Sequence, residues 1–336
     1  MDSLKNQSET SNASWIKIVT KYNRPDAVKS WVQLSVNFFL YSLAWFLMFE
    51  SLSISWWITL GLSVPAAGML VRLFIIYHDC GHGSFFKSGK LNDVVGFIIG
   101  ILSFTPYYSW TRNHYIHHET AGNLDKRGIG DVWTMTVSEY RESSKWRRIM
   151  YRFYRHPVTM FGVGAFYVFL IGNRFTKKGM TKKSRLGVYA TNAGLLLFAV
   201  SMSLLIGIKA FILIQFPIIL LAGIFGFWLF YIQHQFDTTY WSRSETWNYQ
   251  KTALQGSSFY KLPWILRYFS GNIGFHHIHH LSPMIPNYKL SRCHRENSLF
   301  RDVKPITLWA SFRALTLRLW DEKAKVMIGF RKLRLA

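Results

Sequence analysis

The stretch Gly271-Asn-Ile-Gly-Phe-His-His-Ile-His-His280 places four histidines within five residues. Side chains three and four residues apart share one face of a helix, so His276, His279 and His280 would converge. His277 would point away from that face. Neutral imidazole is the commonest side-chain metal ligand, and two rings one helical turn apart can bind one ion. The stretch therefore predicts a metal site, to which other parts of the chain must bring further ligands.

Two other stretches repeat this spacing. His114-Tyr-Ile-His-His118 again has histidines at i, i+3 and i+4, and His78-Asp-Cys-Gly-His82 has them at i and i+4. Nine of the 12 histidines in the chain lie in these three clusters. A single pair is usually structural, but three clusters with matching spacing favour metal binding.

Four long apolar stretches each approach the roughly 20 residues that a membrane-spanning helix needs. They occupy residues 31–49, 54–77, 188–208 and 211–232. This pattern predicts an all-α integral membrane protein with four transmembrane helices. Residues 1–14 lack the features of a cleaved signal peptide. We expect residues 1–30 to be a polar, partly disordered lead-in. Residues 31–336 are expected to form one domain.

The formal net charge of +23 is large, and the basic residues crowd the segments that flank the apolar stretches. This arrangement favours attraction to anionic lipid and docking of an acidic redox partner. No interleaved basic and aromatic repeat supports nucleic-acid binding. Only Cys80 and Cys293 are present, far apart in sequence, which argues against a disulfide framework or a thiolate metal site.

Two shorter apolar stretches, 94–108 and 158–171, decide where the histidines can meet. A crossing at 94–108 would put His78 and His114 on opposite sides of the membrane, so this segment is expected to be re-entrant or interfacial. Basic residues without acids follow residue 171, and by the positive-inside rule both ends of 158–171 are cytoplasmic. We therefore expect 158–171 to dip into the membrane, with both termini and a helical cap in the cytoplasm at the inner cell membrane.

The last apolar stretch ends in Tyr231-Ile-Gln-His234, which adds one more histidine on the cap side. The segment 306–320 has apolar residues at helical spacing with arginines between them, which predicts an amphipathic helix in the interface or packed against the cap. The predicted ligands are then nine. They are His78, His82, His114, His117, His118, His234, His276, His279 and His280.

Nine imidazoles exceed what one ion accepts but suit two ions with four or five each. Imidazole binds zinc, copper, nickel or iron, so the spacing alone does not select the metal. A site at the ends of apolar helices faces lipid tails, whose C–H bonds have no leaving group. This favours a redox metal that activates dioxygen, whereas zinc would serve hydrolysis of a lipid ester. The interiors of the four predicted spans contain no His, Asp or Glu, which argues against a metal transporter.

Carboxylates beside the clusters are candidates to hold the ligand rings, because a ligating histidine usually donates its other N–H to an acceptor. Asp79 and Glu119 adjoin the clusters, and Asp125 and Asp131 follow in the next loop. The alternative for each is an acid in a solvated loop.

The three clusters resemble the histidine boxes of membrane fatty-acid desaturases. Their flanks, Phe74-Ile-Ile-Tyr-His-Asp-Cys-Gly-His-Gly-Ser-Phe-Phe86 and Gly271-Asn-Ile-Gly-Phe-His-His-Ile-His-His-Leu-Ser-Pro283, resemble bacterial acyl-lipid desaturases, above all the cold-induced delta-5 enzymes of Bacillus. The similarity extends through 123–128, 168–179, 228–234 and 256–263, and so covers nearly the whole chain from about residue 30. The boxes alone are shared with hydroxylases and ketolases.

The resemblance implies a non-haem di-iron centre that reduces dioxygen to water and leaves a cis double bond in an acyl chain of a membrane phospholipid. The nine histidines carry over as iron ligands. Animal stearoyl desaturases have an Asn ligand, acting through water, at the position of Phe230, and here Asn272 or Gln233 could take its place. His156 is followed by Pro-Val-Thr rather than the Pro-Gly-Gly of a fused haem domain, so electrons are expected from a separate acidic, ferredoxin-like protein.

Two rival functions fit parts of the pattern. A di-iron hydroxylase or ketolase would have the same ligands but would leave an oxygen atom in the product. A metal-binding membrane protein without catalysis would also need the ligands, and one zinc per chain without iron would favour it. Product analysis separates the first rival from a desaturase, and metal analysis separates the second.

Overall fold

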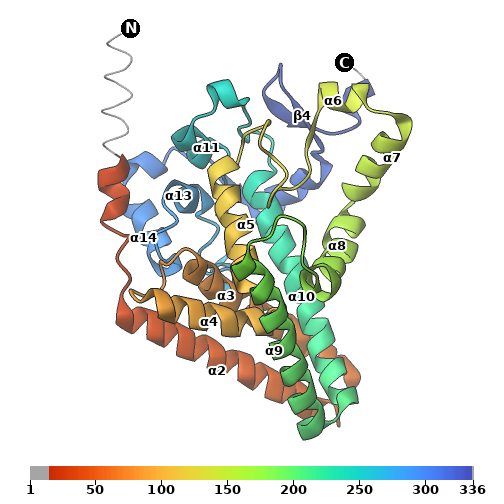
Figure 1. Cartoon of the computed structure of the whole chain (residues 1–336). Helices are drawn as coiled ribbons and strands as arrows, with labels where there is room; N and C mark the ends of the chain where they lie inside the picture. The colour runs from red at the N-terminus through yellow and green to blue at the C-terminus, as the bar shows by residue number, and fades with distance from the viewer. Residues whose placement is uncertain (1–14, 335–336) are drawn as a thin grey trace.

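The computed structural model describes residues 15–334 and is built on four long helices. Each has 25 to 27 residues and is apolar enough to cross a membrane. They are α2 (Ala27–Ser51), α3 (Trp56–Gly81), α9 (Lys182–Ile206) and α10 (Ile208–His234). The four predicted spans are therefore confirmed as helices of sufficient length and composition. Figure 1 shows their ends converging at one side of the molecule, while a cap of shorter elements lies at the other.

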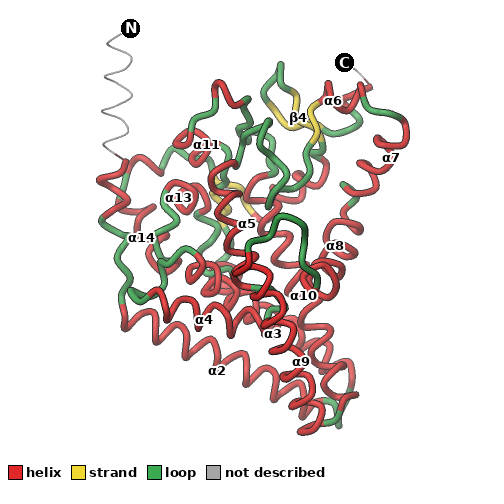
Figure 2. Tube along the Cα trace, viewed as in Figure 1, coloured by secondary structure: helices red, strands yellow, loops and turns green. Residues whose placement is uncertain are grey.

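Helix α3 is the central member of this group. More than half of its apolar window, 56%, is buried within the protein, whereas the value for α9 is 11%. It packs against both α2 and α10 (Figure 2). A hydrogen bond from Trp45 Nε1 to Gln215 Oε1, 3.0 Å long, joins α2 to α10 within this apolar region. The central position of α3 matters because its last turn carries the first histidines.

The segment between the first two histidine clusters turns back on itself. Helices α4 (Gly89–Leu102) and α5 (Tyr107–Thr120) meet at an angle of 103°. The turn is tight because a Cβ atom at Gly96 would lie only 2.2 Å from the ring of Tyr107. Helix α4 packs along α3 and α5 enters the cap. A bend of this size occurs in a broken span as well as in a re-entrant segment, so the re-entrant or interfacial course of 94–108 stays a prediction.

The second short apolar stretch is also helical. Residues Val158–Arg174 form one continuous helical segment of π-helical turns η1 (Val158–Val163) and η2 (Tyr167–Ile171) around a short α8 (Gly164–Phe166), closed by the 3₁₀ turn η3 (Gly172–Arg174). It packs against α10, where a Cβ atom at Gly223 would lie 2.8 Å from the Phe169 ring. That this segment dips into a membrane stays a prediction.

The cap consists of short helices and strands. Its helices are α6 (Val137–Glu142), α7 (Lys145–Tyr154), α11 (Tyr249–Gln255), α12 (Trp264–Phe269), α13 (His276–Leu281), α14 (Asn287–Glu296) and α15 (Leu308–Ser311), with the 3₁₀ turns η4 (Ser244–Thr246), η5 (Ser298–Phe300), η6 (Phe312–Thr316) and η7 (Lys332–Arg334). Its strands are β1 (Met135–Thr136), β2 (Phe259–Lys261), β3 (Pro305–Thr307), β4 (Leu319–Asp321) and β5 (Val326–Ile328). Strand β4 pairs in parallel with β1 and antiparallel with β5, and β2 pairs in parallel with β3.

The predicted amphipathic helix at 306–320 is wrong. This segment contains part of β3, the short helix α15, the 3₁₀ turn η6 and then β4. Its carbonyl groups bind side chains from elsewhere instead of continuing a helix. The Tyr231 hydroxyl donates to Ala314 O at 2.9 Å, and Arg155 Nη2 donates to Leu317 O at 3.0 Å. Tertiary hydrogen bonds therefore override the local helical pattern.

The expected polar lead-in, residues 1–30, is ordered where the structure describes it. Residues 15–20 are helical, and Val19 is buried. The Tyr22 hydroxyl donates to Glu296 Oε2 of α14 at 2.6 Å. The prediction of partial disorder is wrong for residues 15–30, because this part packs against the cap. Residues 1–14, on which the prediction about a signal peptide rests, lie outside the described residues.

Candidate metal centre

Four separate elements bring the nine predicted ligands together. The end of α3 carries His78, with His82 as the residue that caps it, and α10 ends at His234. The other six lie on α5 and α13, at the helical spacings read from the sequence. The nine form two groups, in each of which the potential ligand atoms lie within 4.8 Å of one another. The five-histidine group is His78, His82, His114, His118 and His279, and the four-histidine group is His117, His234, His276 and His280.

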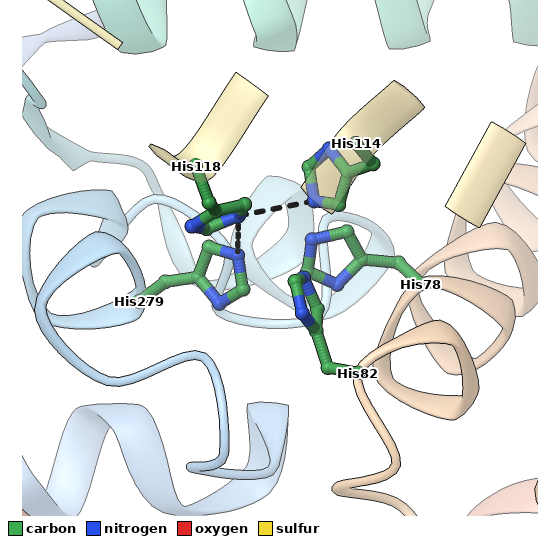
Figure 3. Close-up of side chains that lie close together, drawn as sticks. All are labelled: His78, His82, His114, His118 and His279. Atoms are coloured by element: carbon green, nitrogen blue, oxygen red, sulfur yellow. Dashed lines mark hydrogen bonds between the residues drawn. The ribbon is translucent and has the colours of Figure 1, made fainter. Parts of the chain in front are cut away.

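The five-histidine group joins α3, α5 and α13. Figure 3 shows its rings converging from these three helices on one small volume. His118 Nε2 lies 3.2 Å from His114 Nε2 and 3.0 Å from His279 Nε2. Two imidazole nitrogens bound at about 2.1 Å to one ion stand about 3 Å apart when their bonds meet near a right angle. The spacing of these ring nitrogens therefore fits ligation of one metal ion.

The four-histidine group is centred on the last residue of α10. His234 Nε2 lies 3.1 Å from His117 Nε2 and 3.0 Å from His276 Nε2. The two groups are neighbours, because the rings of His118 and His280 stack with their centroids 4.1 Å apart. The arrangement offers two adjacent metal sites rather than one.

Acceptors on the far side of several rings fix which nitrogen faces the metal site. Asp131 Oδ1 accepts from His117 Nδ1 at 2.8 Å, and Asp79 Oδ1 accepts from His78 Nδ1 at 3.2 Å. The carbonyl of Gly256 accepts from His234 Nδ1 at 3.2 Å. Each such bond leaves Nε2 of a neutral ring with a free lone pair, which is the form that binds a metal.

The tautomers of these histidines show whether the site is suited to bind a metal ion. Because His117 and His234 both donate from Nδ1, their Nε2 lone pairs face each other at 3.1 Å and repel without a cation between them. His82 Nε2 and His280 Nε2 are also buried without a hydrogen-bond partner. Buried nitrogens of this kind are costly unless an ion or a donor satisfies them. The donor set therefore fits bound metal.

Burial also keeps the predicted ligands on the cap helix α13 neutral. The pKa values of His276, His279 and His280 lie well below the usual imidazole value, because burial disfavours the charged ring and neighbouring imidazoles add to that effect. A neutral ring offers a lone pair to a metal, whereas a protonated ring cannot.

The acids suggested by the sequence divide into two kinds. Asp79 and Asp131 contact ligand rings, as described above. Glu119 is exposed and Asp125 pairs with Arg243 Nη1 at 2.7 Å, which favours the alternative of an acid in a solvated loop for these two. The sequence alone could not distinguish Asp125 from Asp131, because both lie in the same loop. Only the fold turns Asp131 toward His117.

Asn272 and His277 also lie away from the two histidine groups. Asn272 donates from its side chain to the Asn287 carbonyl at 3.3 Å, and Asn287 in turn donates from Nδ2 to Asp79 Oδ2 at 2.8 Å. Two residues, Asn287 and Asp79, thus lie between Asn272 and the ring of His78. His277 is buried against Phe259 and belongs to neither group, in agreement with the prediction that it points elsewhere.

Phe230 fills the space one turn before His234. Its ring centroid lies 5.3 Å from that of His117 and 5.7 Å from that of His234. An aromatic ring offers no ligand atom, so this position packs against the four-histidine group instead of contributing to it. Gln233 lines the cavity described next.

A largely apolar cavity of about 520 Å³ extends from the metal site between α3, α10 and the Val158–Arg174 segment. Its lining includes Leu70, Phe169 and Ile219 in the apolar part. His78 and His114 of one group and His276 of the other also line it. The volume lies within the roughly 300–1,000 Å³ of typical small-molecule sites. An apolar chain in this cavity would therefore reach both groups of histidines.

Arg155 is a buried residue that the sequence analysis did not single out. Its side chain is fully buried and donates to Gln235 Oε1 at 2.9 Å, Thr134 Oγ1 at 3.1 Å and Leu317 O at 3.0 Å. Gln235 directly follows His234, one of the predicted ligands. The guanidinium group thus ties the end of α10 to the cap, and its only sequence signal is a cation immediately before an apolar stretch.

Comparison with known proteins adds a second line of evidence. The family model described as "Fatty acid desaturase" matches residues 54–308. The chain is 46% identical over 318 residues to a protein named "Fatty acid desaturase" from Bacillus subtilis (strain 168), covering 95% of this chain and 90% of the relative. The chain belongs to the fatty acid desaturase family. This desaturase family is membrane-bound, in agreement with the four long apolar helices.

More distant relatives of this desaturase carry more specific names. It is 27% identical over 232 residues to the "sn-1 acyl-lipid omega-3 desaturase (ferredoxin)" of Synechocystis sp., covering 66% of this chain and 62% of the relative. It is 29% identical over 252 residues to the "sn-2 acyl-lipid omega-3 desaturase (ferredoxin), chloroplastic" of Helianthus annuus, covering 70% of this chain and 54% of the relative.

Proposed function

We propose that this desaturase introduces a cis double bond, at the delta-5 position, into a saturated acyl chain of a membrane phospholipid. Two adjacent methylene carbons each lose one hydrogen. One dioxygen molecule is reduced to two waters by these two hydrogens together with two electrons and two protons from outside. The apolar cavity that reaches histidines of both groups is the observation that carries the proposal.

The metal is proposed to be iron, with one ion in each histidine group. Iron supplies the chemistry that activates dioxygen for removal of hydrogen from an unactivated C–H bond, which zinc does not. The nine histidines would hold the two ions. Asp79 and Asp131 keep their partner rings in the ligating tautomer, through the contacts at His78 and His117.

The walls of the cavity are proposed to position the acyl chain and to keep water away. Trp110 stacks on His114 with ring centroids 4.4 Å apart, and both line the cavity. Asn173 and Lys177 form a polar part of the same lining. An ammonium group there can contact a phosphate of a phospholipid, which supports an acyl chain attached to a lipid headgroup as the substrate.

The electron donor is proposed to be an acidic, ferredoxin-like protein in the cytoplasm. The net charge of +23 favours such a partner, and the names of two relatives include ferredoxin. Helix α9 begins with Lys182, Lys183 and Arg185 on the cap side, whereas the only basic residue near its other end is Lys209 at the start of α10. By the positive-inside rule, the cap would face the cytoplasm and the spans would lie in the cell membrane.

Expression in a host that makes only saturated fatty acids tests the proposal. We expect one new family of monounsaturated chains, with the double bond located at carbon 5 by mass spectrometry of derivatised lipids. His117→Ala and His279→Ala should each abolish it while the protein stays in the membrane. His156→Ala is the matched control, because His156 is exposed and in neither group. A hydroxylated product, or activity retained in both ligand variants, would contradict the proposal.

A further inference from the structure

Helix α7 (Lys145–Tyr154) has two opposite faces of different character. One face packs on the cap. Tyr151 is fully buried there, and its ring centroid lies 5.0 Å from that of Trp133. The Arg152 guanidinium lies 4.6 Å from the centre of the Phe330 ring. Figure 1 shows α7 at the edge of the cap, beside the end of the Val158–Arg174 segment.

The other face is apolar and exposed. Trp146 is 70% exposed, Ile149 56%, Met150 43% and Phe153 59%. These residues stand at i, i+3, i+4 and i+7, so they form one continuous stripe along the helix. Large apolar side chains gathered in this way on a soluble surface are unusual, and they indicate a surface that contacts something apolar.

Cations border this stripe. Helix α7 contains Lys145, Arg147, Arg148 and Arg152 and no acid. At about 100° per residue, Lys145 and Arg147 fall on opposite sides of the apolar stripe. Within the part of the chain that the structure describes, neither of these two side chains forms an ion pair. An apolar stripe flanked by free cations is the pattern of a helix that lies in the surface of an anionic membrane.

The exposed apolar surface continues beyond α7. Val158 is 68% exposed and Val163 is 55% exposed in the apolar helical segment that follows after three residues. Trp309 of α15, 81% exposed, packs on Phe312, and Phe312 packs on Trp228 of α10. Exposed tryptophans are typical of the boundary between lipid and water. The stripe on α7 thus lies next to a surface that leads to the membrane-spanning part of the protein.

We propose that α7 lies in the membrane surface, with Trp146, Ile149 and Phe153 inserted below anionic phosphate headgroups that Lys145 and Arg147 bind. An acidic soluble protein would complement the cations but would leave the apolar stripe exposed. A bilayer that contains anionic lipid satisfies both features of the helix. This contact is independent of the reaction at the histidine groups.

The full-length protein in lipid nanodiscs can test the position of α7. Both native cysteines, Cys80 and Cys293, are buried, so an introduced cysteine can carry an environment-sensitive fluorophore. We expect Ile149→Cys to give blue-shifted emission that spin-labelled lipids quench, and to shift further when phosphatidylglycerol is added to phosphatidylcholine. Ala324→Cys, exposed in the turn between β4 and β5, is the control and should remain in water.

The charges are tested with a matched pair of variants. Lys145→Gln with Arg147→Gln should weaken the response to phosphatidylglycerol and raise the anionic lipid fraction needed for half of the shift several-fold. Lys304→Gln with Lys323→Gln removes the same charge from other exposed positions and should change nothing. The proposal is overturned if the probe at position 149 stays water-like in both lipids. It is also overturned if that probe responds only to an added acidic donor protein, or only to protein concentration in detergent.

Discussion

Replacing Asp131 with Asn should weaken metal binding at the four-histidine group. Asp131 accepts from His117 Nδ1 at 2.8 Å, and the side chains of His117 and Asp131 are only 1% and 7% exposed. A buried hydrogen bond to a charged group contributes about 1.5–3 kcal/mol, and an amide oxygen replaces only part of that. The loss expected for metal affinity is about 10-fold to 100-fold, the usual range for groups that orient a metal ligand.

Asp125→Asn is the matched control for this experiment. It makes the same chemical change in the same loop, but Asp125 pairs with Arg243 at the surface. A surface ion pair contributes little, so metal binding should not change. Both acids lie in the loop that follows the histidine cluster on α5, so only their different places in the fold can separate the two variants.

Chelator competition gives the measurement. Purified protein is equilibrated with increasing chelator, and the metal that remains per chain is measured by mass spectrometry. In Asp131→Asn, one of two metals should leave at a 10-fold to 100-fold lower chelator concentration than in the wild type. The reasoning is refuted if this variant retains both metals like the wild type, or if Asp125→Asn shows the same loss.

Three further results are expected. Gly226→Leu should reduce activity on long acyl chains more than on short ones in product analysis. Gly226 lines the cavity, and a Cβ atom added there meets no atom within 4 Å, so the new side chain can enter the cavity without a clash at its base. Gly61→Leu on α3 is the control, because a Cβ atom there is equally free of contacts. Arg155→Met should lower the melting temperature and destabilise the fold by about 3 kcal/mol or more, because several buried acceptors lose a charged donor. Arg331→Met, at an exposed position, should leave the melting temperature unchanged. His276→Leu should lose one metal per chain whereas the adjacent His277→Leu should keep both, and equal metal contents would count against the grouping.

The four spans could be predicted because the requirement that defines them is local. A helix in lipid needs a long apolar run, and hydropathy reports that directly. Most ends of the observed helices lie a few residues beyond the predicted stretches, but α3 begins two residues after, and α9 ends two residues before, the predicted boundary. Helix α2 starts at Ala27 because the Asp26 side chain accepts from the Lys29 N–H, although its polar first turn lies outside the apolar run.

The ligand set could be predicted in part. Helical spacing identified the clusters, and the end of α10 added His234. The division into two groups could not be predicted, because neighbouring residues on one helix serve different groups. His117 belongs to the four-histidine group and His118 to the other, since α5 lies between the partners of both. Such a division depends on how α5 and α13 meet in space.

Segments governed by tertiary contacts were the least predictable. The apolar spacing at 306–320 resembles that of a helix, but Arg155 and Tyr231 bind its carbonyl groups and β4 pairs with β1 and β5. The clear amphipathic helix of the cap is α7 instead. Its sequence is short, and its exposed apolar face becomes evident only when the opposite face is seen to be buried.

Metal analysis of the purified protein tests the central claim most directly. If the nine histidines hold two iron ions in two groups, the wild type should contain two irons per chain. His117→Ala should retain only the metal of the five-histidine group, and His118→Ala only that of the four-histidine group. One zinc per chain without iron, or two irons retained in both variants, would contradict the account.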